Sequence, residues 1–143
     1  MNTTVEQELL AKGRTVIQTT GVSMEPLLHN RKSSVVLVRP ERALRKNDVV
    51  LFKRRGEYVL HRIIRLLPDG RYVIKGDNCY GHDIVKLDAV IGLMEGYYPN
   101  ESDIYIPCGC DAYRRYIRTV PLRHKKIQIE AIIYKILKKM GLR

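Results

Sequence analysis

Short apolar runs, separated by glycine, proline or charged residues, recur between residues 14 and 94 of the chain. Such runs are typical of β-strands, because a few β-branched and aromatic residues can cross a sheet and turn residues end them. A short helical pattern over residues 5–11 precedes them, and Gly13 is expected to end it. The sequence therefore predicts a mainly β fold with strands at residues 14–19, 33–39, 49–54, 57–66, 71–75 and 88–94.

The C-terminal part of the chain has a helical period instead. Its apolar residues are spaced three and four apart, which places them on one side of a helix. They are Ile129, Ile132, Ile133, Ile136, Leu137 and Met140. We expect a helix over about residues 124–141, with Pro121 marking the boundary before it. The pattern divides the chain into a domain of residues 1–98 and an extension of residues 99–143.

The charge distribution separates the same two parts. The chain has 143 residues and a formal net charge of +11, and residues 114–143 contain ten Lys or Arg and one Glu. A nearly neutral remainder argues against a nucleic-acid-binding core, so we expect no nucleic-acid partner. A basic amphipathic helix over residues 121–143 could contact an anionic membrane, dock on a partner, or simply pack on the domain.

Composition also bears on where the protein acts. The apolar runs are too short for a transmembrane helix, and the first twenty residues lack the apolar segment of a secretory signal. Three cysteines without a framework spacing fit a reducing, cytoplasmic setting. Cys108 and Cys110 lack a second His or Cys pair at zinc spacing, so no metal site is expected.

Candidate chemistry begins at residues 21–26, which read Gly-Val-Ser-Met-Glu-Pro. Gly21 permits a tight turn, and Ser23 follows it as a possible nucleophile. A serine hydroxyl attacks a carbonyl only when a neighbouring base accepts its proton. The simpler interpretation is that Ser23 caps a helical turn.

A base and a carboxylate lie further along the chain. His61 ends an apolar strand segment and could accept a proton near neutral pH. Asp77, within the turn-like Lys-Gly-Asp-Asn of residues 75–78, and Asp83 could each orient an imidazole. Each residue also has a simpler interpretation. His61 could be a half-buried strand histidine, Asp77 part of an Asx-turn, and Asp83 a loop carboxylate.

Together these motifs resemble the signal peptidase I family, within it the archaeal and endoplasmic-reticulum type that uses Ser and His. The related repressor-type self-cleaving peptidases of the S24/S26 superfamily share its fold. The resemblance covers roughly residues 14–95 and implies a coiled β-sheet domain. The matching stretches occur in the family's order, at residues 21–26, 48–50, 60–62 and 75–78, with Asp83 beyond them.

The resemblance implies a serine endopeptidase that cleaves a peptide or leader sequence without a metal or an organic cofactor. Ser23 would be the acylated nucleophile and His61 the base. Asp83 matches the third triad member, with Asp77 as the alternative or supporting carboxylate. Residues near the nucleophile and base would shape the substrate pocket, namely Met24, Pro26 and Leu60.

Two departures from the family keep other functions open. Gly21 stands where the family usually has a hydroxyl that donates to the oxyanion, and Thr20 is the nearest substitute. Losing one such donor costs about a hundredfold or more in rate. The family's membrane anchor is also not expected here. The alternative is a weakly active or inactive peptide-binding module on the same fold. A repressor-like regulator is less favoured, because few residues precede the motifs.

Overall fold

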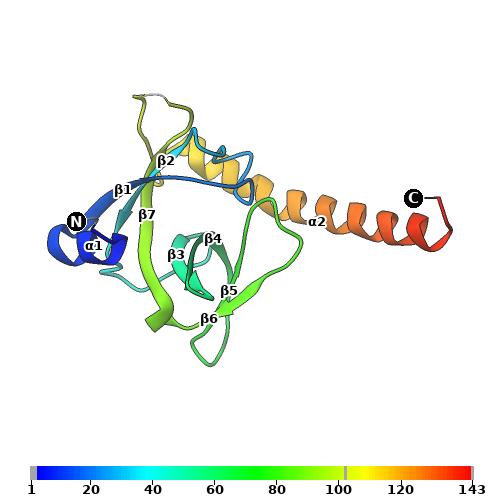
Figure 1. Ribbon diagram of the computed structural model, residues 1–143, viewed down its shortest axis with the longest axis horizontal. Helices are drawn as coiled ribbons and strands as arrows, with labels where there is room; N and C mark the ends of the chain where they lie inside the picture. Colours follow the sequence, from blue (N-terminus) through cyan, green and yellow to red (C-terminus); the bar gives the residue numbers. More distant parts are fainter. Residues whose placement is uncertain (1–2, 102, 143) are drawn as a thin grey trace.

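The computed structural model describes residues 3–101 and 103–142. It contains an open antiparallel sheet with a short helix at one end of the chain and a long helix at the other (Figure 1). This confirms the predicted mainly β fold class. The elements are α1 (Val5–Lys12), β1 (Arg14–Gln18), β2 (Ser34–Val38), β3 (Val49–Arg54), β4 (Glu57–Leu66), β5 (Tyr72–Lys75), β6 (Asp83–Val85), the 3-10 turn η1 (Leu87–Ala89), β7 (Val90–Tyr98), β8 (Ile106–Pro107) and α2 (Asp111–Lys139).

The strand order brings the sequence motifs to neighbouring strands. The sheet runs β1-β2-β7-β3-β4-β5-β6, with β8 beside β7. His61 on β4 pairs with Val50 on β3, and Arg62 pairs with Lys75 at the end of β5. Asp83 on β6 pairs with Ile74. The loop after Lys75 therefore begins directly beside the His-Arg pair of β4.

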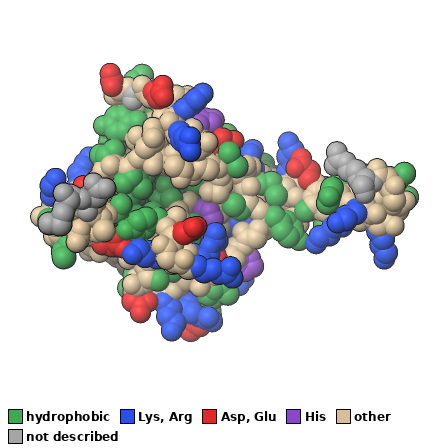
Figure 2. Space-filling model, in the orientation of Figure 1, with side chains coloured by type: hydrophobic (Ala, Val, Ile, Leu, Met, Phe, Trp, Pro, Cys, Tyr) green, Lys and Arg blue, Asp and Glu red, His purple; other side chains and the backbone are tan. Residues whose placement is uncertain are grey.

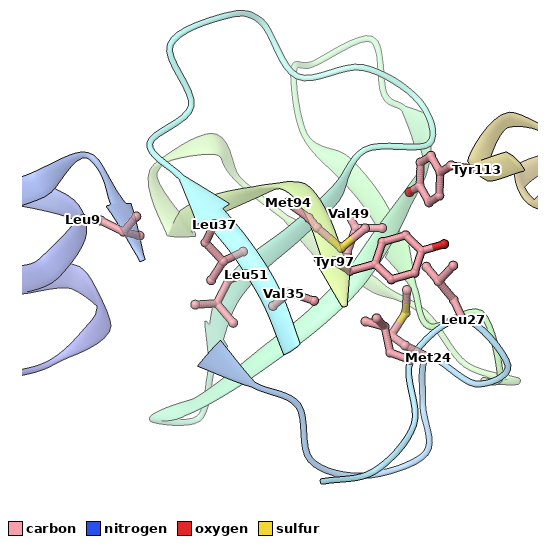
Figure 3. Close-up of a cluster of buried hydrophobic side chains, with 11 residues drawn as sticks. Leu9, Met24, Leu27, Val35, Leu37, Val49, Leu51, Met94, Tyr97 and Tyr113 are labelled. Carbon is pink, nitrogen blue, oxygen red and sulfur yellow. The ribbon is translucent and has the colours of Figure 1, made fainter. Parts of the chain in front are cut away.

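Two clusters of buried side chains lie on the two faces of the sheet. Alternate residues of β3 point to opposite faces, so Val49 and Leu51 join one cluster while Val50 and Phe52 join the other. The first cluster collects residues from α1, from the segment around Ser23 and from the start of α2, as Figure 3 shows. The members labelled in the figure are Leu9, Met24, Leu27, Val35, Leu37, Val49, Leu51, Met94, Tyr97 and Tyr113.

The C-terminal helix is longer than its periodicity predicts. The expected start near residue 124 is wrong, because α2 begins at Asp111 and contains Pro121. A proline inside a helix costs about 3 kcal/mol, and here burial of the preceding turns opposes that cost. Tyr113 and Val120 are each 3% exposed. Packing against the domain, which a local pattern does not contain, therefore sets where the helix begins.

Two strands were not predicted from the sequence. β6 has three residues and β8 has two, so neither is long enough to show an alternating pattern. Both form by pairing with a longer neighbour, β6 with β5 and β8 with β7. The first of them matters for the site, because β6 carries Asp83.

Candidate active site

A cleft of about 780 Å³ lies between the first strand, the segment around Ser23, the β3–β4 hairpin and the loop before β6. Ser23, His61 and Asp83 all line it. Met24 and Leu60, two of the predicted pocket residues, line it as well. Residues 23, 61 and 83 come from separate parts of the chain, so the fold alone brings them to one cavity.

Ser23 is held at the cleft by a glycine turn and a buried neighbour. Gly21 has a φ of +83°, a left-handed conformation that favours glycine, and its N–H donates to Asn30 Oδ1 at 2.7 Å. Met24 is only 4% exposed and packs in the first core cluster. Its carbonyl accepts from Leu28 N at 3.0 Å, which closes a single helical turn. Ser23 thus lies between a hydrogen-bonded glycine turn and a buried side chain.

His61 lies on β4 and is a buried residue, with 6% exposure. This burial lowers the pKa of His61 below its ordinary value of 6.5, and the negative charge of Asp83 opposes the shift. The imidazole is therefore neutral at neutral pH, the form that can accept a proton. Its Nδ1 atom has no hydrogen-bond partner among the residues that the structure describes.

Gly76 marks the point where the Ser23 segment and His61 approach each other. A Cβ atom on Gly76 would lie 2.7 Å from the Ser23 carbonyl oxygen and 3.0 Å from His61 Nε2. It would also lie 2.6 Å from Cys79 Sγ. Only glycine permits this convergence, because a side chain would push the backbone of the candidate nucleophile away from the candidate base.

The two candidate carboxylates occupy different environments. Asp83 lines the cleft, and its Oδ2 accepts from Arg54 Nη1 at 2.7 Å. Asp77 does not line the cleft and is fully buried. It pairs with Arg62 through two hydrogen bonds of 2.7 and 2.8 Å. The structure therefore places Asp83 with Ser23 and His61, and places Asp77 in a buried ion pair beside them.

Arg62 is the centre of a polar network that sequence reasoning missed. It has no exposed surface, and it donates to Asp77, to the Asn47 carbonyl oxygen and to Tyr113 Oη. Tyr116 Oη donates to Asp77 Oδ2 at 2.7 Å. An arginine within the apolar segment of β4 was the available signal, since a charged residue there needs a buried partner.

Helix α2 holds the loop that supports Ser23. Arg123 donates to Asn78 Oδ1 at 2.9 Å, and His124 Nε2 lies 2.9 Å from the Gly76 carbonyl oxygen. Asn78 in turn donates its backbone N–H to the Ser23 carbonyl oxygen at 2.8 Å and its side-chain amide to Val22 at 3.0 Å. The helix is therefore connected to the backbone of the candidate nucleophile through a single loop.

Other predicted or chemically relevant groups are placed as follows. Pro26 is exposed and does not line the cleft, whereas Thr20 and Gly21 do. Cys79 also lines the cleft, and burial raises the pKa of its thiol.

Within residues 3–101 and 103–142, no group of three or more His, Cys, Asp or Glu could hold a metal ion. No helix in those residues is long and apolar enough to cross a membrane.

A mainly β domain whose cleft is lined by a serine, a buried neutral histidine and an aspartate has the features of a serine-peptidase-type fold. A protein-family model described as Peptidase S24-like matches residues 2–93, and the chain belongs to this family. This confirms the S24 part of the resemblance, while the signal peptidase I part remains a prediction. No curated protein matches the chain.

Proposed function

We propose that the protein is a serine endopeptidase that cleaves a peptide or leader sequence by acyl transfer, with the Ser-His chemistry of the signal-peptidase-like class. The observation that supports this most is the lining of one cleft by Ser23, His61 and Asp83. Membership of the Peptidase S24-like family supports it independently. The free cysteines fit a reducing setting, so we place its action in the cytoplasm.

In the proposed reaction, Ser23 Oγ attacks the scissile carbonyl carbon while His61 takes the hydroxyl proton. The tetrahedral intermediate collapses to an acyl-enzyme, and His61 returns the proton to the leaving amine. Water then attacks the ester with His61 again as the base, which frees Ser23. Asp83 would stabilise the transient imidazolium, and to reach Nδ1 its carboxylate would turn from Arg54 toward the ring.

The substrate class follows from the walls of the cleft. Two strand edges border it: β1 stands at the end of the sheet order, and β4 pairs with β5 only from Arg62 onward. An extended peptide could therefore add to one of these edges as a further strand. Apolar side chains would receive its side chains, namely Ile17, Leu28, Leu51, Val59 and Leu60.

A serine-reactive fluorophosphonate probe tests the proposal without knowledge of the client. We expect one covalent label, located by mass spectrometry on Ser23, because only an activated hydroxyl reacts readily with the probe. Ser23→Ala should remove the label, and Ser34→Ala should keep it, since Ser34 starts β2 and does not line the cleft. Absence of labelling on a folded protein would reject the peptidase.

The second candidate function is a peptide-binding module that keeps the cleft but lacks turnover. Two observations favour it: His61 Nδ1 has no hydrogen-bond partner among the described residues, and Asp83 is bonded to Arg54. Such a module would bind peptides with equal affinity before and after Ser23→Ala, and the probe would leave Ser23 unmodified. The same labelling experiment therefore separates the two functions.

Asp83→Asn is expected to lower kcat by roughly 10²- to 10⁴-fold, because the amide no longer stabilises the imidazolium. The charge of Asp83 raises the pKa of His61, so removing it lowers that pKa further. Activity requires neutral His61, so the acidic limb of the pH–rate profile should move to lower pH. A pH–rate profile of kcat measures both effects. Asp88→Asn, an exposed control outside the cleft, should change neither, and an unchanged profile in Asp83→Asn would exclude its role.

A further inference from the structure

Helix α2 has two faces, and only one of them touches the domain. The inward face carries the residues that contact the domain or are buried against it, which are Tyr113, Tyr116, Val120, Arg123 and His124. Further along, Lys135 Nζ lies 5.5 Å from the centre of the Tyr80 ring. Beyond these residues the helix projects away from the sheet, as Figure 1 shows. The second half of α2 therefore extends past the body of the protein.

The projecting half carries large apolar side chains on its other face. Successive helix residues are about 100° apart, which places this outward face roughly half a turn from the inward one. Its apolar residues are between 48% and 65% exposed, and they are Ile129, Ile132, Ile133, Ile136 and Met140. At about 1.5 Å per residue the segment from Ile129 to Met140 is about 17 Å long. The apolar stripe predicted from the sequence is thus directed away from the domain.

Basic residues surround this stripe and also precede it on the same face. Arg114, Arg115 and Arg118 lie outward in the first turns, and all three are exposed. The projecting half has five lysines against a single acid, Glu130. Lys125, Lys126 and Lys139 flank the stripe, whereas Lys135 lies over the Tyr80 ring and Lys138 lies on the inward side. Figure 2 shows hydrophobic and basic side chains together on this part of the molecule.

We propose that the outward face of α2 binds the surface of an anionic lipid bilayer. A bilayer interface accepts apolar side chains and attracts lysine and arginine at the same depth, so it matches both properties of the face. A nucleic acid would satisfy the charges but leave five apolar side chains in water. A second copy would cover those side chains but bring the basic flanks of two helices together.

On the membrane, α2 lies in the plane of the interface with its inward face toward the domain. Because the helix is bonded to the loop of residues 76–78, the cleft is held at a constant position relative to the lipid surface. The proposal does not depend on peptidase activity, since it rests only on the exposed half of α2.

Co-sedimentation of the full chain with vesicles tests the proposal. We expect binding to phosphatidylcholine vesicles that contain about 30 mol% phosphatidylserine, and much weaker binding to phosphatidylcholine alone. Raising salt from about 0.1 M to about 1 M shortens the Debye length from ~10 to ~3 Å and should release the protein. Lys125→Gln with Lys139→Gln should weaken binding about fivefold per lysine, because both exposed lysines lie on the side of the stripe.

Removing apolar side chains tests the other half of the proposal. Ile133→Ser with Ile136→Ser should weaken binding by about tenfold or more, because less apolar area enters the interface. Leu10→Ser, with 74% exposure on α1, and Lys12→Gln serve as matched controls and should bind as the parent does.

Three results would overturn the proposal. The first is no binding to either vesicle, and the second is equal binding to both. The third is a dimer, seen by sedimentation velocity, that the change at Ile133 and Ile136 dissociates, since a second copy would then occupy the face. Labelling of Ser23 by the fluorophosphonate probe should be the same in all these variants, so failure of lipid binding and failure of the peptidase are distinguishable.

Discussion

Replacing Ser23 by alanine is expected to lower kcat by about 10⁴- to 10⁶-fold while leaving KM nearly unchanged. The alanine cannot form an acyl-enzyme, whereas the cleft that binds the peptide keeps its other walls. His61→Gln should cause a loss of similar size, because a serine without its base is a poor nucleophile. The double variant should be no worse than either single one, since the two side chains act as one unit.

Cleavage of a fluorogenic peptide library by purified protein measures this effect. Ser34→Ala is the control for the serine, and His29→Gln is the control for the histidine, since neither residue lines the cleft. Both controls should retain the parent rate. Cleavage by Ser23→Ala at the parent rate would show that the hydrolysis comes from another group or another protein.

Asp77→Ala is expected to lower the free energy of unfolding by about 3–5 kcal/mol. It would leave the guanidinium of Arg62 buried at 0% exposure without its counter-charge, and breaking one side of a buried ion pair has costs of this size. Tyr116, which donates to Asp77, would lose its acceptor as well. Urea denaturation followed by circular dichroism measures the change.

Two comparison variants make this prediction specific. Asp69→Ala breaks an exposed pair with Arg71 and should leave the urea midpoint almost unchanged, because solvent screens such a pair. Arg62→Met combined with Asp77→Leu removes both buried charges and should be much less harmful than Asp77→Ala alone. If Asp77→Ala unfolds at the parent urea concentration yet loses activity as Asp83→Asn does, Asp77 would be the orienting carboxylate instead.

Variants of Asp77 and Asp83 are expected to behave differently, because the two aspartates have different roles. Asp83 lines the cleft, and its charge acts on the pKa of His61. Asp77 connects β4 to α2 through Arg62 and Tyr116, and its loop supports the Ser23 backbone. Loss of Asp77 should therefore reduce activity by displacing the site, and loss of Asp83 should reduce it in a protein of ordinary stability.

The sequence by itself determined the mainly β class, most of the strands and the short first helix. These are local properties: apolar runs and breaker residues act within a few positions, and a capping box at Thr4 with Gly13 at φ +72° delimits α1. The ordered motifs around Ser23 and His61 could also be identified from the sequence, because each depends on a few adjacent residues.

Only the tertiary structure decided which residues share a cleft and which are buried. Asp77 and Asp83 lie six positions apart, and it is the pairing of β4 with β5 and of β5 with β6 that directs one to Arg62 and the other to the cleft. The start of α2 and the face it turns to the domain were decided in the same way. Both depend on contacts between residues distant along the chain, and such contacts leave no period in the sequence.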